Sequence, residues 1–277
     1  MRIVRDIESL RKARGRGALA FVPTMGGLHE GHLALVRMAR ERAARVAVSI
    51  YVNRMQFSPG EDFERYPRSL QRDCEKLERE DVDLVFAPDE HEVYPEPQRY
   101  IVDPPPIADE LEGMFRPRFF HGVATVVLKL FNCVQPSIAI FGKKDYQQLV
   151  IVRGMVRQFN LPIEIVAGET VREPDGLAMS SRNAYLSAAE RAEAPSLYRT
   201  LKHIRDRLAA GERESGALQA DAVRSLAASG WKPDYVELRE RHTLAVPAPA
   251  HRDFVILGAA RLGQPLHRVP GHDQGPD

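Results

Sequence analysis

The chain alternates short apolar runs with segments whose apolar residues recur every three or four positions. The apolar runs, several of them rich in β-branched residues, predict buried strands at 17–23, 46–52, 83–88, 137–142 and 162–168. The remaining segments indicate helices at 3–13, 31–44, 69–80, 122–134 and 144–160. Apolar strands that alternate with helices are typical of a doubly wound, mostly parallel sheet with helices on both faces.

This alternation fades after about residue 170. Residues 187–228 are helix-rich, and the runs 234–239 and 253–262 indicate an antiparallel pair of strands. We therefore predict an α/β protein with a Rossmann-like doubly wound domain over residues 1–170 and a smaller α+β domain over residues 171–277. The last ten or so residues are polar and rich in Gly, Pro and His, and we expect them to fray.

Composition narrows the class of protein. The 277 residues include 39 Lys and Arg against 38 Asp and Glu, so no bulk charge draws the chain to nucleic acid or to a membrane. The sequence shows neither a secretory h-region nor an apolar run of about 18 residues, which predicts a cytoplasmic protein. Cys74 and Cys133 form no CxxC or Cys/His cluster, and we expect both to be buried free thiols.

Ligands of a doubly wound sheet bind outside the carboxyl ends of its strands, so the loops after strands are informative. The first such loop, in FVPTMGGLHEGHLALV (21–36), leads from a strand into a helix. We expect free backbone N–H groups and the positive end of the helix dipole there, and both favour an anion. Gly26 and Gly27 permit a tight turn, and His29 and His32 share one face of the first helical turn. The loop predicts a phosphate site.

Two other interpretations of these histidines stay open. The zinc-binding motif HExxH spaces its histidines four apart and needs a third ligand, whereas this chain has HEGH and no evident partner. The two side chains could also serve only to cap the start of the helix. We favour nucleotide phosphate binding over both.

Two further loops also suit phosphate. FGKKDYQQ (141–148) places Lys143 and Lys144 at a helix N-terminus, where the dipole disfavours cations by ~0.3 to 1 kcal/mol unless an anion is bound. TVREPDGLAMSSRNAYL (170–186) has two hydroxyls and a guanidinium in succession, which can bind several polyphosphate oxygens. A solvated lysine pair or an ordinary helix cap would explain either loop taken alone.

A fourth loop, YVNRMQFSPGEDFERYPRSL (51–70), is less charged at its start. Its Asn53 and Gln56 carry amides that can hydrogen-bond hydroxyl and carboxylate groups. Four polar loops thus follow predicted strands of one sheet, and three of them suit phosphate. Such a combination argues against coincidence, and it favours a nucleotide phosphate site.

In chain order, these segments resemble a known family. PTMGGLHEGH is similar to the HxGH form of the HIGH nucleotide-binding motif, and MSSR to that superfamily's counterpart of the KMSKS loop. Their combination with VNRMQF, EDFERYPR, FGKKDYQQL and TVREPDGLAMSSRN is specific to the pantothenate synthetases, which are pantoate:β-alanine ligases that use ATP. The resemblance extends from about residue 17 to residue 186, and more loosely to the C-terminus.

The resemblance implies a reaction in two steps. Pantoate attacks the α-phosphate of ATP to give pantoyl adenylate and pyrophosphate, and β-alanine then attacks the acyl carbon to give pantothenate and AMP. ATP implies Mg²⁺, which is held mostly by phosphates, so we assign no metal-binding residue. The family further implies a homodimer with no nucleic-acid or membrane partner, and a smaller domain that closes over the ATP site.

The resemblance also implies site residues. His29, His32 and Lys144 would be catalytic groups on the phosphates, with His32 favoured as proton donor. The ATP site would comprise Met25, Gly26, Gly27, Leu28, His29, Glu30, Gly31, His32, Gly142, Lys143, Lys144, Asp145, Val171, Met179, Ser180, Ser181 and Arg182. The pantoate and β-alanine site would comprise Gln56, Gln148, Asn53, Tyr66 and Arg116.

Two segments depart from the family pattern. NRMQF has Arg54 where we expect proline, and we expect its side chain to point to solvent rather than to pantoate. RPRFFHG (116–122) has Arg118 and Phe119 where we expect a small residue and a histidine. This difference weakens any β-alanine role for that segment.

Three other functions share parts of the pattern. A nucleotidyltransferase that moves AMP onto a phosphate ester shares HxGH but does not require both Gln56 and Gln148. An aminoacyl-tRNA synthetase would need a basic anticodon-binding region, which a net charge of +1 does not indicate. A non-catalytic nucleotide-binding regulator would not need Lys144 and Arg182 in addition to two histidines.

Overall fold

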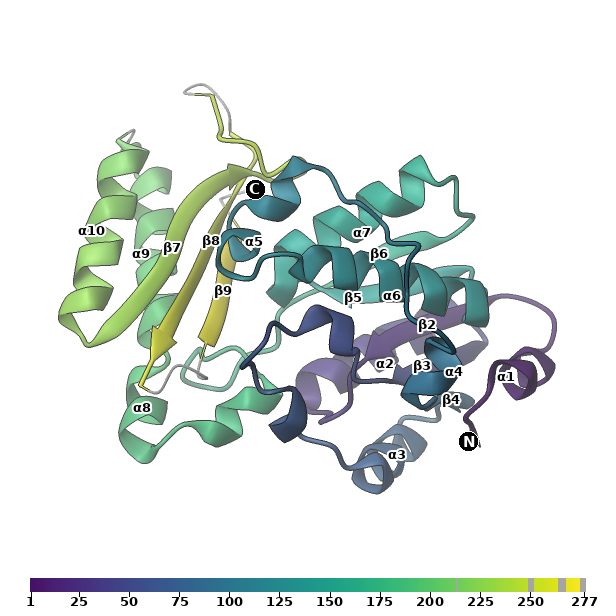
Figure 1. Cartoon of the computed structure of the whole chain (residues 1–277). Helices are drawn as coiled ribbons and strands as arrows, with labels where there is room; N and C mark the ends of the chain where they lie inside the picture. The colour runs from purple at the N-terminus through teal and green to yellow at the C-terminus, as the bar shows by residue number, and fades with distance from the viewer. Residues whose placement is uncertain (213, 249–251, 264–267, 275–277) are drawn as a thin grey trace. The chain divides into compact units, whose positions relative to one another are not determined.

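The computed structural model describes residues 1–212, 214–248, 252–263 and 268–274, and gives only the backbone for the last of these ranges. It consists of two compact units (Figure 1). Unit 1 comprises Met1–Gly142 and Ile151–Glu169, and unit 2 comprises Lys143–Val150 and Thr170–Asp277. The binding roles predicted for domains 1–170 and 171–277 stay predictions.

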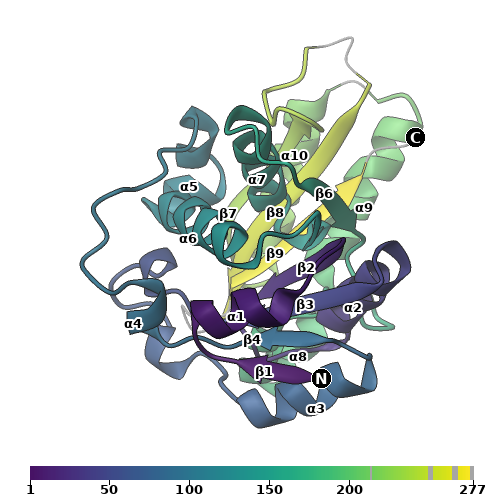
Figure 2. The same cartoon turned by 90° about the vertical axis from the view of Figure 1, so that its right-hand side faces the viewer.

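Unit 1 is built on a six-stranded sheet whose strand pairings are all parallel. Its strands are β1 (Arg2–Val4), β2 (Leu19–Thr24), β3 (Arg45–Ile50), β4 (Leu84–Phe86), β5 (Ile138–Gly142) and β6 (Glu164–Gly168). Their spatial order is β1-β4-β3-β2-β5-β6, and Figure 2 shows the succession from β2 to β1. Strand β2 pairs with β3 on one side and with β5 on the other, so the order reverses there. The loop after β2 therefore lies at the topological switch point, where such sheets bind ligands.

Helices cover both faces of this sheet, which confirms the predicted doubly wound fold. The longer ones are α1 (Ile7–Arg14), α2 (Glu30–Arg42), α3 (Leu70–Arg79), α6 (Phe119–Val134) and α7 (Tyr146–Gln158). The short turns are η1 (Arg54–Gln56), η2 (Phe63–Arg65), α4 (Glu90–Val93), η3 (Pro106–Asp109) and α5 (Glu112–Phe115).

Strand β2 shows why the buried strands are apolar throughout. Ala20 and Val22 belong to the core cluster that contains Val36 of α2, whereas Phe21, between them, packs edge-on against Phe131 of α6, with ring centroids 6.4 Å apart. Burial of a side chain the size of Phe contributes roughly 1.5–3 kcal/mol. Both faces of the strand thus favour apolar residues, and the alternation of a half-exposed strand is lost.

The N-terminal prediction was wrong in one respect. A helix was expected over 3–13, but the chain first forms β1, which pairs with β4 at the edge of the sheet. Asp6 then caps α1, its side chain accepting the Ser9 N–H at 2.7 Å. A strand of three residues is too short to show a hydrophobic period, so the sequence pattern carries no signal for it.

Unit 2 contains an antiparallel sheet of β7 (Trp231–Glu240), β8 (Phe254–Leu262) and β9 (Arg268–Gln274), in that order. Its helical segments are η4 (Lys143–Asp145), the first turn of α7, η5 (Ser181–Tyr185), α8 (Ala188–Glu193), α9 (Ser196–Ala209) and α10 (Ser215–Ala228). Helices α9 and α10 lie beside this sheet (Figure 1), and Leu197 and Leu201 share a core cluster with Trp231 and Ile256.

The antiparallel pairing of the two predicted strands, β7 and β8, is confirmed. The expected fraying of the C-terminus is wrong for 268–274, which pair with β8 as β9, and residues 275–277 lie outside the described part. Composition misled here because an edge strand is held by backbone hydrogen bonds, for which polar side chains suffice.

Two further expectations concern thiols and membranes. Cys74 is buried and Cys133 is half-buried; both are free thiols, and burial raises the pKa of each. Within the described ranges, no helix combines the length and the apolar character that a membrane span requires.

The close approach of α6 to η1 predicts a stability difference between two glycines. A Cβ on Gly122 would overlap the Met55 carbonyl, so Gly122→Ala must displace backbone and should lower the free energy of unfolding by about 1–3 kcal/mol. Gly154→Ala in α7 is the control, since nothing lies within 4 Å of its Cβ, and it should raise stability by roughly 0.5–1 kcal/mol. Urea unfolding measures both, and equal stabilities would contradict the prediction.

Candidate active site

The loop after β2 turns on two glycines in the left-handed region. Gly26 has φ +84° and Gly27 has φ +63°, conformations that other residues adopt only with strain. A Cβ on Gly26 would also lie 3.0 Å from Asp73 Oδ2 and 3.1 Å from Ile50 Cγ2. Glycine at position 26 thus allows α3 and the end of β3 to approach the loop closely.

Two side chains of helix α3 bind the backbone of this loop, and both of them contact Leu28. The buried carboxylate of Asp73 accepts the N–H groups of Gly27 at 2.9 Å and Leu28 at 2.8 Å, and Lys76 Nζ donates to the Leu28 carbonyl. Neither Asp73 nor Lys76 was predicted from the sequence, because the pattern of α3 is that of an ordinary amphipathic helix. The one signal available was an acidic residue within the apolar stripe of that helix, between Leu70 and Leu77.

The two predicted histidines begin helix α2. His29 is the N-cap residue, and its Nδ1 accepts the Gly31 N–H at 3.1 Å. His32 Nδ1 accepts the backbone N–H of His29 at 3.4 Å, and the two ring centroids are 4.1 Å apart. An Nδ1 that accepts a hydrogen bond carries no proton, so the neutral form of each ring holds its proton on Nε2.

The expectation of free backbone N–H groups in this loop was wrong. Side chains accept the N–H groups of Gly26, Gly27, Leu28, His29 and Gly31. Thr24 Oγ1 is the acceptor for the first of these, at 3.2 Å. The histidines are thus helix caps, as one alternative held. An anion at this loop would be bound by side chains more than by these amides.

Glu30 and Gly142, also predicted for the ATP site, lie at the edges of this region. Glu30 is exposed and accepts a hydrogen bond from Arg37 at 2.6 Å, which holds the pKa of its carboxyl below the ordinary value. Gly142 ends β5 and is paired with Gly168 of β6. The bond to Arg37 and the pairing with Gly168 do not indicate that Glu30 or Gly142 binds phosphate directly.

Two of the amides predicted for substrate binding, Asn53 and Gln56, lie near the loop after β2. Gln56 Nε2 is 2.9 Å from Met25 Sδ, and Gln56 Oε1 is 3.2 Å from Asn53 Nδ2. Tyr66 is buried, with its ring centroid 6.0 Å from that of Phe57. The structure thus brings Asn53 and Gln56 together with Met25 of the predicted ATP site.

Arg116 is held by protein groups on every side. Its guanidinium donates to both Glu61 carboxylate oxygens, at 2.8 and 2.6 Å, and to the Gln56 carbonyl at 3.0 Å. It also lies 3.4 Å from a Glu112 oxygen and 3.8 Å above the Phe119 ring. These contacts favour a role in fixing the backbone of Gln56 over direct contact with a substrate.

The residues that depart from the family pattern have local partners. Arg54 has a side chain that is 56% exposed, as expected for a residue pointing to solvent, and it lies 3.4 Å from Glu64 and 3.6 Å from Glu90. Arg118 precedes α6 with φ +63°, and Phe119 packs against the Arg116 guanidinium. Phe119 thus contributes an aromatic surface where a histidine was expected.

In unit 2, the predicted lysines lie in the turn η4 just before α7. Lys143 and Lys144 are half-buried, and Lys144 Nζ is 3.6 Å from the Asp145 carboxylate. Gln148 is half-buried in the first turn of the helix. The hydroxyl of Tyr146 anchors this turn by donating to the Arg241 carbonyl at 3.1 Å.

The segment 170–186 folds back on itself, which brings together Val171 and Met179, two residues predicted to contact ATP. The Met179 N–H donates to the Val171 carbonyl at 3.0 Å, beside an antiparallel bridge between Arg172 and Ala178. Asp175 tightens the turn by accepting the Leu177 N–H at 3.1 Å.

The same segment is fixed from outside the turn. The Arg191 guanidinium beside Asp175 holds the pKa of that carboxyl below its ordinary value. Ser180 Oγ accepts the Arg182 N–H at 3.3 Å, which begins η5. Ser180 is thus a cap, while Ser181 and Arg182 follow it in the turn, half-buried.

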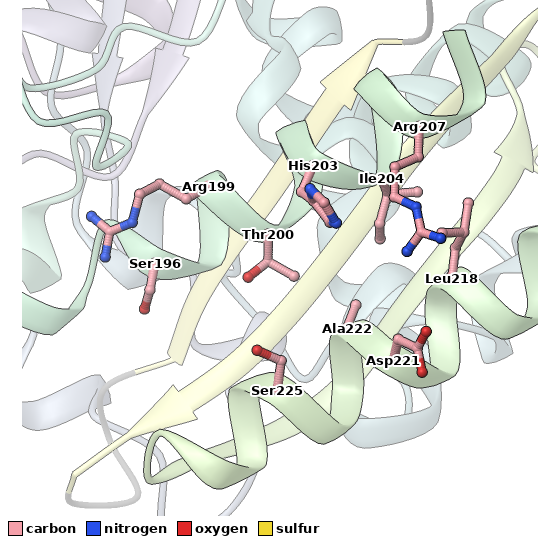
Figure 3. Close-up of a pocket in the computed structure, with 10 residues that line it drawn as sticks. All are labelled: Ser196, Arg199, Thr200, His203, Ile204, Arg207, Leu218, Asp221, Ala222 and Ser225. Carbon is pink, nitrogen blue, oxygen red and sulfur yellow. The ribbon is translucent and has the colours of Figure 1, made fainter. Parts of the chain in front are cut away.

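Unit 2 also contains a pocket of about 330 Å³ between α9 and α10 (Figure 3). Arg199, His203 and Arg207 line it from one face of α9, and Asp221 faces them from α10. Arg207 is already paired with Glu212 through two bonds of 2.7 and 2.8 Å. None of the residues predicted for ATP or the substrates lines this pocket.

Comparison with known proteins gives consistent matches. A family model described as pantoate-beta-alanine ligase matches residues 2–267. The chain is 58% identical to a pantothenate synthetase of Nitrosospira multiformis over 265 residues, 95% of each chain. It is similar to a solved pantothenate synthetase of Thermus thermophilus, with 44% identity, a TM-score of 0.94 and all of both chains covered.

A further solved relative carries ligands. The pantoate-beta-alanine ligase of Francisella tularensis, complexed with beta-gamma ATP and beta-alanine, is 31% identical to this chain. The two structures match with a TM-score of 0.84 over 99% of this chain and 97% of the other.

A doubly wound sheet with a histidine-capped loop at its switch point defines an α/β enzyme of the nucleotide-binding kind. The family model covers nearly the whole chain, and a curated relative is more than half identical. The chain belongs to the pantoate–beta-alanine ligase family. It is therefore a ligase that forms a carbon–nitrogen bond.

The clamp on the loop predicts the effect of Asp73→Asn. An amide has one acceptor oxygen in place of two, so one buried N–H loses its partner, and the free energy of unfolding should fall by about 1–3 kcal/mol. Because the loop carries His29, we expect turnover to fall as well. Glu75→Gln, an exposed position on the same helix, is the control and should change neither quantity. Equal behaviour of the two variants in thermal unfolding and turnover would contradict the clamp.

Proposed function

We propose that this chain condenses (R)-pantoate with β-alanine, at the expense of ATP, to give pantothenate, AMP and pyrophosphate. A carboxylate is a poor electrophile, so pantoate is first activated as pantoyl adenylate, and the β-alanine amine then displaces AMP. Membership of the family supports this reaction, as does the ligand pair of the Francisella tularensis relative. The observation that carries it is the pair of histidines at the switch point, whose Nδ1 atoms accept backbone N–H groups, so that a neutral ring has its donor on Nε2.

These donors suit the first step. As pantoate attacks the α-phosphate, negative charge accumulates on the phosphate oxygens, and donors already held in place stabilise that charge without reorganising. We assign His29 and His32 to the phosphates and His32 to proton donation. Lys144 adds a positive charge in the same role, because its ammonium group binds phosphate as a point charge.

We assign the amides to the second substrate. Gln56 and Gln148 would bind the carboxylate and hydroxyls of pantoate, and Gln56 would also help to place β-alanine. The contacts of Asn53 and Arg116 favour roles that hold Gln56 in place. A nucleotidyltransferase acting on a phosphate ester would need cations at this position, whereas Asn53 and Gln56 are neutral amides and the Arg116 guanidinium is paired with Glu61.

The remaining ATP contacts belong to this proposal as well. We assign adenine to Val171, ribose to Asp145, and the triphosphate to residues 179–182. The backbone bond that joins Val171 to Met179 supports a shared function for the two ends of segment 170–186. The closing of residues 171–277 over the nucleotide is a further part of the proposal.

The proposed function also includes the metal ion, the cellular location and the oligomeric state. Among the described residues, no three His, Cys, Asp or Glu side chains are grouped as metal ligands would be. Because ATP reacts as a metal complex and Mg²⁺ prefers phosphate oxygens, we place the ion on the phosphates and assign it no protein ligand. We also propose a cytoplasmic homodimer, on family resemblance.

A product assay tests the reaction. AMP and pyrophosphate should form from ATP only when pantoate is present, and pantothenate only when β-alanine is added. Separation of nucleotides by chromatography, with each substrate omitted in turn, measures this dependence. Consumption of ATP with a phosphate-ester acceptor and not with pantoate would show a nucleotidyltransferase instead.

The histidine assignment predicts a defect in the first step. His32→Ala should lower the rate of adenylate formation by ~10² to 10⁴, the range typical of a positioned proton donor. His91→Ala, at an exposed position on α4, is the matched control and should react normally. Pyrophosphate release in a single turnover, with circular dichroism as a check on folding, measures both variants. Near-normal release by His32→Ala would remove that residue from the mechanism.

A further inference from the structure

Asn53 is 1% exposed, and its amide is bound on both sides. Its Nδ2 lies 3.2 Å from the Gly122 carbonyl and 3.2 Å from Gln56 Oε1. Its Oδ1 lies 2.9 Å from the hydroxyl oxygen of Tyr94, the C-cap residue of α4. Tyr94 is not among the site residues predicted from the sequence.

The direction of every bond in this network follows from one group. The Gly122 carbonyl can only accept, so the amide atom that faces it must be the Asn53 nitrogen. The Asn53 oxygen then faces Tyr94, whose hydroxyl is forced to donate. The remaining hydrogen on Nδ2 fixes the oxygen of Gln56 toward Asn53. Each orientation depends on the one before it.

These bond directions determine which atom of the Gln56 amide can contact a substrate. With its oxygen held by Asn53, its Nε2 lies on the side of Met25. A carboxylate offers only acceptors, so it can bind the nitrogen of an amide but not the oxygen. Gln56 in the reversed orientation would repel an anionic substrate.

We propose that Tyr94 is a positioning residue for pantoate, since its hydroxyl holds Asn53, and through it Gln56, in the orientation that presents N–H donors. The inference rests on the proposed function in that it takes pantoate as the ligand of Gln56. Burial and the Glu90 carboxylate hold the pKa of Tyr94 above its usual value, so the hydroxyl keeps its proton at neutral pH.

A neighbouring tyrosine provides a matched control. The ring centroid of Tyr51 lies 6.4 Å from that of Tyr94, and Tyr51 is 6% exposed. Among the described residues, its hydroxyl has no hydrogen-bond partner. Tyr51→Phe thus removes a buried hydroxyl from the same region without breaking a bond.

Steady-state kinetics distinguish positioning from a general loss of structure. Tyr94→Phe leaves Asn53 Oδ1 buried without a donor, so only the Gly122 carbonyl still orients that amide. Asn53 and Gln56 are then held less firmly, and we expect KM for pantoate to rise about tenfold. KM for ATP should stay within about twofold, because the phosphates of ATP are assigned to His29, His32 and Lys144 and not to the amides of this network. Tyr51→Phe should leave both constants unchanged. An unchanged pantoate KM in Tyr94→Phe, or an equal rise for both substrates, would overturn the inference.

A second variant tests the relay independently of Tyr94. The carboxylate of Asn53→Asp can accept from Tyr94 but cannot donate to Gly122 or Gln56. We expect pantoate KM to rise at least as far as in Tyr94→Phe, and the double variant to resemble Asn53→Asp alone, since both changes break one chain of bonds. Additive effects would show that Tyr94 acts by another route.

A measurement without substrate separates this inference from the proposed function. The side-chain amide signals of Asn53 and Gln56 in nitrogen-15 spectra should shift in Tyr94→Phe and stay in place in Tyr51→Phe. If these signals shift but the wild-type enzyme makes no AMP with pantoate, the proposed function fails and the relay stands. If they do not shift, the relay fails whatever the substrate is.

Discussion

The buried carboxylate of Asp73 accepts two backbone N–H groups from the loop that joins β2 to α2, and the position of the histidines depends on it. Glycine at position 26 allows this contact, because a Cβ there would lie 3.0 Å from the carboxylate. Lys76 holds the carbonyl of the residue just before His29. A ligand-binding loop at a switch point must be accessible to the ligand and yet rigid. The hydrogen bonds from α3 make this loop rigid.

In the predicted ATP loop and in the predicted substrate region alike, a backbone group that can only donate or only accept orients the side chains around it. At the loop, backbone N–H groups can only donate, so they force Nδ1 of each histidine to accept and leave the proton on Nε2. At Asn53, the Gly122 carbonyl can only accept, and it directs the nearby amides. Backbone groups of fixed polarity thus set the donors of both regions before a substrate arrives, which is how an enzyme avoids reorganisation during reaction.

Much of the fold was predictable because burial on both faces gives strands such as β2 an unmistakable apolar run. The glycines and histidines of the first loop were also visible, since they follow that run directly. What the sequence could not show were partners distant along the chain. Asp73 lies 45 and 46 residues from the N–H groups it accepts, and Tyr94 lies 41 residues from Asn53. Strand β1 was missed because it is too short to carry a period, and β9 because edge pairing does not require apolar residues.

The most direct test of these orientations is the tautomer of the two loop histidines, read from imidazole nitrogen-15 signals of the ligand-free enzyme. We expect both His29 and His32 to be Nε2–H tautomers when neutral, and their Nε2 signals to move when ATP is added. A proton on Nδ1 of either ring would contradict the structure of the loop. Signals that do not respond to ATP would contradict the assignment of these rings to its phosphates.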